Sequence, residues 1–415
     1  MEEKKVSSLK RELKLKKFQF NSIYEFSSTL YSSFDIDNIV RIFFSTLMGQ
    51  LGVSRTLLME TEHQLLEFKG FRLAAEDVDF LKRTLPALVE GDVYLRVEDL
   101  PDEQDELRQI LLAKKIRYLV NISEGKKHVF LGLGLKFNKI ELKTEDLEFC
   151  FFISRFAMIA IDNAFMLNRM IEAKRIEHEI EIASDIQLSL LPQTVPELEN
   201  FELAVIYKPI NEVGGDYYDI LRERNGRLPV LIADVEGKGL PAALLAASSQ
   251  AIFHSLNELY FFEPAKFIAK ANSLICDFTK GNRFITLFWM LIDDKKKTVT
   301  YVNAGHEEPL LISGDEVKTL STGGFLTGFL DSAEYNAHTL RLKKGDMIVA
   351  FTDGVPEVEN PVGEEFGKEA LIEFFKQNNK LPAKKLAEKL FKTMKEFSAG
   401  TRFRDDYTLL VLKAR

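Results

Sequence analysis

One segment with strong helix signals divides this chain into two parts. Residues 169–192, RMIEAKRIEHEIEIASDIQLSLLP, contain neither glycine nor proline before Pro192, which ends the helix. The small and apolar side chains follow a spacing of three and four residues, interrupted at Gln187, and are Ala173, Ile176, Ile180, Ala183 and Leu190. This spacing predicts a coiled-coil linker of about three heptads and a homodimer. A helix packed on its own domain is the alternative. Folded regions are expected on both sides of it.

The size and composition of the chain fit this division. A length of 415 residues favours two or three domains, and 46% apolar with 28% charged residues is typical of a globular protein. A net charge of −8 provides no basic field for nucleic acid. Cys150 and Cys276 lie too far apart in the sequence to suggest a zinc cluster or a disulfide framework.

The sequence gives no sign of a leader or a membrane anchor. The first 20 residues are charged throughout and lack an apolar signal core. The most apolar long run, CFFISRFAMIAIDNAFML, contains Arg155, Asp162 and Asn163, which makes it a poor membrane span. We therefore expect a cytoplasmic protein.

The region before the linker alternates helices and short strands. We expect an N-terminal helix over residues 1–19, then two helices that break at SSFDID, with Asp35 and Asp37 placed to cap the second. Strands are predicted in VSRTLLME, QLLEFKGFRL, IRYLVNISEG and KHVFLGLGLKF, and a long helix opens at Thr144. With the segments FDIDNIVRIFF and TEDLEFCFFISRFAMIAIDNA, residues 20–168 resemble a GAF domain. That resemblance implies a sensory module for a small molecule or a protein signal; a ligand-free dimerisation module is the alternative.

The region after the linker, residues 193–415, has a different pattern. Strands are predicted in FELAVIYKP, LPVLIADV, ITLFWMLID and KTVTYVNAG, and long helices in PAALLAASSQAIFHSLNEL and PAKKLAEKLFKTMKEF. The helices alternate with clusters of strands rather than with single strands. The sequence therefore predicts a layered α+β architecture with antiparallel sheets, and not a doubly wound parallel sheet.

Four aspartates of this region lie at strand ends or in glycine-rich turns. Asp234 and Asp353 each end an apolar strand, Asp405 precedes another, and Asp216 lies in VGGDYYDI. Each aspartate alone is most simply a turn-former. Together they provide oxygen ligands of the kind that Mg²⁺ and Mn²⁺ prefer, because carboxylates at the edge of one sheet can converge. The sequence IADVEGKGLPAAL lacks the Gly and Ser/Thr positions of a phosphate-binding P-loop.

Six motifs in one order resemble the PP2C-type serine/threonine phosphatases, in their bacterial SpoIIE and RsbU branch. They are GGDYYD, ADVEGKGLPAAL, NAGHEEPLL, GDMIVAFTDGVPEVEN, GEEFG and RDDYTLLVL, and they cover roughly residues 190–415. The resemblance implies an α-β-β-α sandwich with two Mn²⁺ or Mg²⁺ ions. It assigns the metals to Asp216, Asp234 (bridging both), the backbone carbonyl of Val235, Asp353 and Asp405; Asp405 is preferred to Asp406 because the family's aspartate stands three residues before the threonine, here Thr408.

Two cations about 3.5–4 Å apart lower the pKa of a bound water and neutralise phosphate charge, so no protein nucleophile is needed. Glu236 stands where relatives carry serine or a proton-donating histidine; it is either a proton donor or an outer-sphere or solvent-facing residue. Lys238 is interpreted as a solvated turn residue rather than a phosphate ligand, and His306 as a structural residue of its turn.

The resemblance implies a phosphoserine or phosphothreonine protein as substrate, of the anti-anti-sigma type, in a partner-switching pathway controlled by the GAF-like domain. Two rival functions remain. GGDYYD is close to the GGDEF signature of diguanylate cyclases, but that signature requires Glu-Phe where this chain has Tyr217 and Tyr218. A catalytically weak phosphatase-like scaffold that signals by binding is the other alternative.

Overall fold

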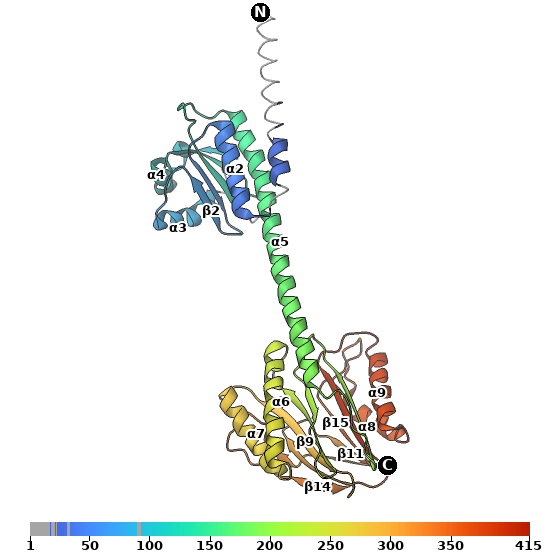
Figure 1. The fold of residues 1–415 in the computed structure, drawn as a ribbon. Helices are drawn as coiled ribbons and strands as arrows, with labels where there is room; N and C mark the ends of the chain where they lie inside the picture. The colour runs from blue at the N-terminus through green and yellow to red at the C-terminus, as the bar shows by residue number, and fades with distance from the viewer. Residues whose placement is uncertain (1–16, 18–20, 22, 31–33, 89–92, 126) are drawn as a thin grey trace, which may run out of the picture. The chain divides into compact units, whose positions relative to one another are not determined.

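The computed structural model describes residues 17, 21, 23–30, 34–88, 93–125 and 127–415 (Figure 1). The chain divides into two compact units, Met1–Lys174 and Arg175–Arg415. The helix predicted over residues 1–19 lies outside the described residues, apart from Lys17. Each unit has hydrophobic cores of its own.

The first unit begins with two helical segments, as predicted. Residues 23–30 are helical, and α2 spans Ile36–Leu51. Asp35 caps α2, because its carboxylate accepts a hydrogen bond of 3.1 Å from the Asp37 backbone N–H. The helix ends at Gly52, whose φ of 65° suits the left-handed conformation that often ends helices. Asp37 lies in the first turn, where its negative charge is favourable.

An antiparallel sheet with the order β2-β1-β5-β4-β3 forms the centre of the first unit. Its strands are β1 (Thr56–Glu60), β2 (Leu65–Lys69), β3 (Tyr94–Arg96), β4 (Ile116–Asn121) and β5 (Val129–Gly134). One core joins α2 and the first half of helix α5 to the sheet, and a second core joins α3 (Ala75–Thr84) and α4 (Asp105–Ala113) to it. Helices α3 and α4 and strand β3 are additional to the elements predicted from the sequence.

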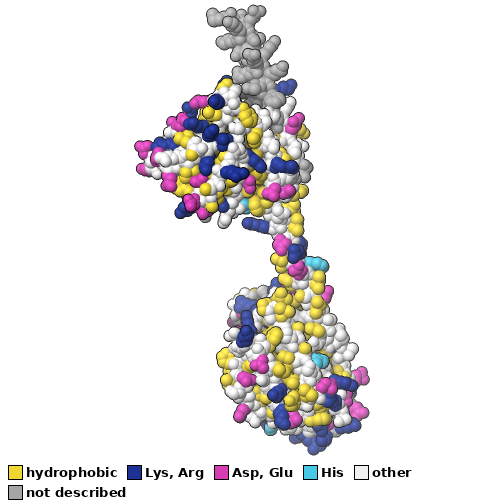
Figure 2. Space-filling view, turned by 60° about the vertical axis from the view of Figure 1, so that its left-hand side comes forward, with side chains coloured by type: hydrophobic (Ala, Val, Ile, Leu, Met, Phe, Trp, Pro, Cys, Tyr) yellow, Lys and Arg dark blue, Asp and Glu magenta, His cyan; other side chains and the backbone are white. Residues whose placement is uncertain are grey.

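Helix α5 runs without interruption from Thr144 to Leu190, so the helix that opens at Thr144 and the predicted linker are one element. It ends two residues before Pro192. Among the described residues, α5 alone is long and apolar enough to cross a membrane by length and composition. A core helix passes the same test, and the first half of α5 buries Ile153, Ala157 and Ile161 in the core of the first unit. Further along, apolar side chains lie exposed between charged ones (Figure 2).

Two stacked sheets form the second unit (Figure 1). The first has the order β13-β10-β9-β8-β7, with β14 also paired to β10, and the second has the order β12-β11-β15-β16-β6. All pairs are antiparallel except β10 with β13. The strands are β6 (Phe201–Lys208), β7 (Tyr217–Ile220), β8 (Arg227–Val235), β9 (Ile285–Asp293), β10 (Thr298–Ala304), β11 (Leu310–Ser313), β12 (Glu316–Thr319), β13 (Gly323–Gly324), β14 (His338–Arg341), β15 (Met347–Phe351) and β16 (Tyr407–Ala414).

Three hydrophobic cores hold these layers together. One lies between the sheets, where residues such as Ile232 and Phe288 of the first sheet meet Ile348 and Leu410 of the second. Another packs α6 (Leu240–Tyr260) and α7 (Pro264–Thr279) on the outer face of the first sheet, and a third packs α8 (Gly367–Gln377) and α9 (Ala383–Phe397) on the second. The second unit is therefore a mixed α-β-β-α structure with antiparallel sheets; α7 and α8 were not anticipated.

Candidate active site

The four aspartates singled out from the sequence come from both sheets. Asp234 is the penultimate residue of β8 and lies opposite Thr286 of β9. Asp216 immediately precedes β7, the neighbour of β8. Asp353 follows β15 by two residues, and Asp405 precedes β16 by two. Strands at one edge of the sandwich thus position all four side chains.

Hydrogen bonds connect the two sheets at this edge. The buried carboxylate of Asp216 accepts hydrogen bonds from the hydroxyl of Thr352, at 2.7 Å, and from that of Thr408. Thr352 is next to Asp353 in the sequence, and Thr408 is three residues after Asp405. Asp216 of the first sheet is therefore held against the strand ends of the second. Neither threonine is part of a sequence pattern that predicts a role at the site.

The neighbouring residue Asp406 fixes the loop that carries Asp216. Its two carboxylate oxygens accept backbone N–H bonds from Ile210, at 2.8 Å, and from Gly215, at 2.7 Å, with Asp216 at 3.3 Å. Asp406 is 5% exposed, and both of its carboxylate oxygens already accept hydrogen bonds from backbone N–H groups. Asp405 is half-buried, and its Oδ1 accepts a bond from the next N–H at 2.8 Å.

Glycines allow the backbone segments of the site to approach closely. A Cβ on Gly215 would lie 3.1 Å from the carbonyl oxygen of Val235, and one on Gly354 would lie 2.0 Å from the carbonyl oxygen of Asp406. The first contact is tighter than side chains normally tolerate and the second is impossible. The glycines of GGDYYD and FTDG therefore let the aspartate loops pack against one another.

The site concentrates negative charge. Burial raises the pKa of Asp234 to about 7, and the nearby carboxylates of Asp353 and Asp405 add to the shift. Burial and the charge of Asp234 raise the pKa of Asp216 well above its ordinary value. The pKa of Asp353 is raised by burial and then by Asp405. These mutual effects place the aspartates in one electrostatic cluster.

A lysine lies among these carboxylates. The Lys238 ammonium pairs with the Asp405 carboxylate and donates a hydrogen bond of 3.0 Å to the Arg404 carbonyl oxygen. The bond to Asp405 raises the pKa of Lys238. The side chain is 55% exposed, in agreement with a turn residue, but no local sequence pattern indicates its pairing with Asp405.

Two other predicted residues, Val235 and Glu236, directly follow Asp234 in the chain. Val235 is buried at the end of β8, next to Asp234. Glu236 is half-buried and lines a cavity of about 200 Å³ together with Arg283, Leu244 and four other residues. Its backbone N–H donates to the Phe284 carbonyl oxygen at 3.1 Å.

His306 has a structural position. Its Nδ1 lies 2.9 Å from the hydroxyl oxygen of Thr286, and its backbone N–H donates to the Asn303 side-chain oxygen at 2.8 Å. Burial lowers the pKa of His306 to about 3, so the ring is neutral at neutral pH. These contacts support the structural interpretation of NAGH.

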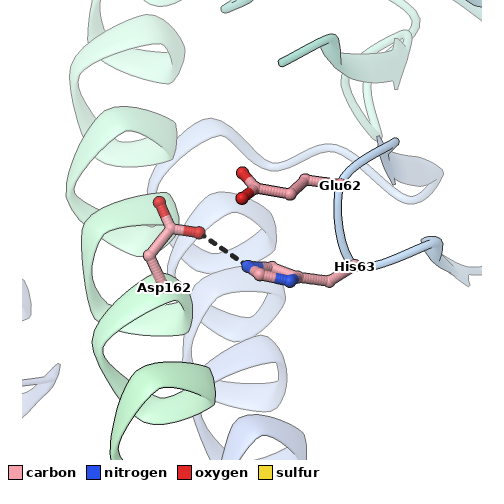
Figure 3. Close-up of side chains that lie close together, drawn as sticks. All are labelled: Glu62, His63 and Asp162. Carbon is pink, nitrogen blue, oxygen red and sulfur yellow. Dashed lines mark hydrogen bonds and ion pairs between the residues drawn. The ribbon is translucent and has the colours of Figure 1, made fainter. Parts of the chain in front are cut away.

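A second polar cluster lies in the first unit (Figure 3). Glu62, His63 and Asp162 each place a potential ligand atom within 4.8 Å of the others, and His63 Nε2 lies 3.1 Å from Asp162 Oδ1. The His63 ring stacks on Phe165 with 3.9 Å between centroids. The Lys127 ammonium pairs with Asp162 and lies 3.8 Å from Glu62. Because these side chains already pair with one another and with Lys127, we interpret the cluster as an ion-pair network that joins the β1–β2 turn to α5.

Several known proteins are similar to this chain. The family model of Stage II sporulation protein E (SpoIIE) matches residues 224–415. Phosphoserine phosphatase RsbU of Bacillus subtilis is 30% identical over 246 residues, which are 58% of this chain and 72% of RsbU. Protein IcfG of Synechocystis is 25% identical over 304 residues, 65% of this chain but only 44% of IcfG. The solved SiaA-PP2C domain of Pseudomonas aeruginosa superposes with a TM-score of 0.53 at 22% identity, over 58% of this chain and 98% of that domain.

The PP2C-like fold and these relatives define the protein as a serine/threonine protein phosphatase. The chain belongs to the SpoIIE family, with RsbU among its relatives. The family resemblance seen in the six sequence motifs is thereby confirmed for the second unit.

Proposed function

We propose that the second unit is a two-metal phosphatase that hydrolyses phosphoserine or phosphothreonine on a small protein of the anti-anti-sigma type. The observation that carries the proposal is the convergence of Asp216, Asp234, Asp353 and Asp405 at one edge of the sandwich. The name of the relative RsbU, phosphoserine phosphatase, supports the same reaction. The substrate class follows from the resemblance to the SpoIIE and RsbU branch, whose members act in partner-switching pathways.

The donor set fits a hard divalent cation. The candidate ligands are the carboxylates of the four aspartates and the carbonyl oxygen of Val235, and oxygen is the ligand that Mn²⁺ and Mg²⁺ prefer. The raised pKa values of Asp216, Asp234 and Asp353 indicate negative charge that the protein itself does not fully neutralise. A pair of divalent cations would supply the missing charge.

Each residue then has a defined role. Asp234 would hold both ions, with the Val235 carbonyl beside it, while Asp216, Asp353 and Asp405 would complete the set. Thr352 and Thr408 orient the Asp216 carboxylate through their hydroxyls. When bound, the ions supply a water of lowered pKa and neutralise charge on the phosphoryl group. Glu236 is the candidate proton donor to the leaving serine oxygen.

The remainder of the chain is proposed to regulate this reaction in the cytoplasm. Residues 20–168 would form a GAF-like sensor for a small molecule or a protein signal, and residues 169–192 a coiled-coil linker in a homodimer. The phosphatase domain would span residues 193–415. The unbroken α5 helix and the exposed side chain of Ile176, a residue of the predicted seam, support this arrangement.

The test compares the wild-type chain with Asp234→Asn. Chelator-treated protein is supplied with Mn²⁺ or Mg²⁺ and a phosphorylated anti-anti-sigma-type protein, and phosphate release is measured beside random phosphopeptides. We expect metal-dependent release from the protein substrate, and none with the variant, which changes one ligand oxygen. Metal-independent release, or an active Asp234→Asn protein, would refute the metal assignment. Equal rates on random peptides would refute a dedicated protein substrate, and tight binding without release would favour a scaffold.

A further inference from the structure

Lys238 is a cation that the chain itself places in the carboxylate cluster. Its ammonium has two hydrogen-bond acceptors, the Asp405 carboxylate and the Arg404 carbonyl oxygen at 3.0 Å. Both acceptors lie 166 or 167 residues further along the chain, so the contact is a product of the tertiary fold. The carboxylate that Lys238 holds is one of the candidate metal ligands.

The backbone around Lys238 holds it in this position. Glu236 is fixed to the neighbouring strand segment through its N–H bond of 3.1 Å to the Phe284 carbonyl oxygen, and α6 begins at Leu240. Between these two points, Gly237 and Gly239 have φ values of 97° and 73°, which L side chains rarely adopt. The chain therefore makes a tight turn with Lys238 at its centre, and the side chain returns towards Asp405.

We propose that Lys238 is a built-in counter-cation that competes with divalent metal for Asp405 and thereby sets the metal affinity of the site. The inference rests on the proposed function, in which Asp405 is a metal ligand. The Asp405 carboxylate oxygen that pairs with the Lys238 ammonium is a good ligand for a metal ion. An incoming ion must displace the lysine before it can bind this oxygen. The displaced ammonium stays tethered by the short turn, where it repels the bound ion. Both effects weaken metal binding.

A direct role in holding substrate phosphate is the competing explanation for a lysine in this loop. The two explanations predict different measurements. A phosphate ligand affects the KM for the phosphoprotein and leaves metal affinity unchanged. A counter-cation affects metal affinity in the absence of any substrate.

The experiment is calorimetric titration of Mn²⁺ into the chelator-treated full-length chain, without substrate. The variant is Lys238→Met, which keeps the aliphatic stem and removes the charge. The matched control is Lys344→Met, an exposed lysine before β15, at the opposite end of that strand from Asp353. We expect Lys238→Met to bind Mn²⁺ about tenfold more tightly than wild type, because the repulsion between a nearby single charge and a double charge in a water-like dielectric is of this order. Lys344→Met should bind as wild type does, and Lys238→Arg, which keeps the charge, should not gain affinity.

Unchanged or weaker Mn²⁺ binding by Lys238→Met would overturn the inference, as would an equal gain in Lys344→Met. A wild-type chain that binds no Mn²⁺ at all would instead refute the proposed function. Fluorescence of the single tryptophan, Trp289, which is buried in the second unit, shows that each variant is folded.

Discussion

Asp405 and Asp406 are neighbours in the sequence, and the structure predicts opposite consequences for their replacement by asparagine. The Asp406 carboxylate accepts backbone hydrogen bonds on both of its oxygens, from Ile210 on one side and from Gly215 and Asp216 on the other. An asparagine retains one acceptor oxygen and turns an NH₂ group towards the donors on the other side. At least one backbone N–H, partly or fully buried, then loses its acceptor.

The cost follows from these contacts. A hydrogen bond to a charged group contributes about 1.5–3 kcal/mol, and a buried donor without an acceptor costs about 1–3 kcal/mol. We therefore expect Asp406→Asn to lower the free energy of unfolding of the second unit by about 3 kcal/mol. For a unit of this size such a change lowers Tm by about 6–12 °C.

Thermal unfolding of the full-length chain, followed by Trp289 fluorescence, reports on this unit because Trp289 is the single tryptophan of the protein. The control is Asp405→Asn, which removes a partly exposed ion pair with Lys238 and should change Tm by less than about 4 °C. In contrast to this small effect on Tm, Asp405→Asn should weaken Mn²⁺ binding. The reasoning is refuted if Asp406→Asn is as stable as wild type, or if Asp405→Asn is the less stable of the two.

Two other predictions follow from the charge cluster and the linker. The pKa of Asp234 is about 7 in the folded protein and about 4 in an unfolded chain. Between pH 4 and pH 7 the folded state therefore binds more protons than the unfolded state does. Denaturant titrations should therefore show the chelator-treated second unit losing stability as the pH rises from 4 to 7, and Asp234→Asn should reduce that slope; a rise in stability would contradict the assignment. Replacing Ile176 and Ile180 by glutamate should convert a dimer into monomers in light scattering and uncouple turnover from any signal; a monomeric parent chain would exclude the mechanism.

The elements that the sequence predicted well are long or strongly periodic. Strand β9 and helix α6 have enough apolar residues to be identified without any tertiary information. Helices α3, α4 and α8, of 9 to 11 residues, are too short to be stable alone and depend on the sheets that they cover. Helix α7 is different: its buried Phe267, Ile268, Ala271 and Ile275 follow helical spacing, so its sequence does carry a helix pattern.

In the candidate site, too, some residues carry a local sequence signal and others do not. Asp216, Asp234, Asp353 and Asp405 were found because each lies at a strand end or in a motif. Their supporting residues had no such signal, since Thr352 and Thr408 are ordinary residues in or beside a strand. The hydrogen-bond partners of Asp406 and the ion-pair partner of Lys238 lie 160 or more residues away in the sequence. Contacts of that kind are set by the tertiary fold, and no local pattern reports them.

The pairing of β16 with β6 has a consequence for biosynthesis. Strand β6 opens the second sheet at Phe201, and its partner β16, which completes the sheet between β6 and β15, is made some 200 residues later. On the ribosome, β6 therefore lacks this neighbour until residues 407–414 emerge. The loop with Asp405 and Asp406 emerges only just before them. A pairing this distant in sequence is slow to form, because loop closure costs entropy before any contact offsets it. Nascent chains that end before β16 should thus expose an open sheet edge to chaperones, and the carboxylate cluster should assemble only in the last step of folding.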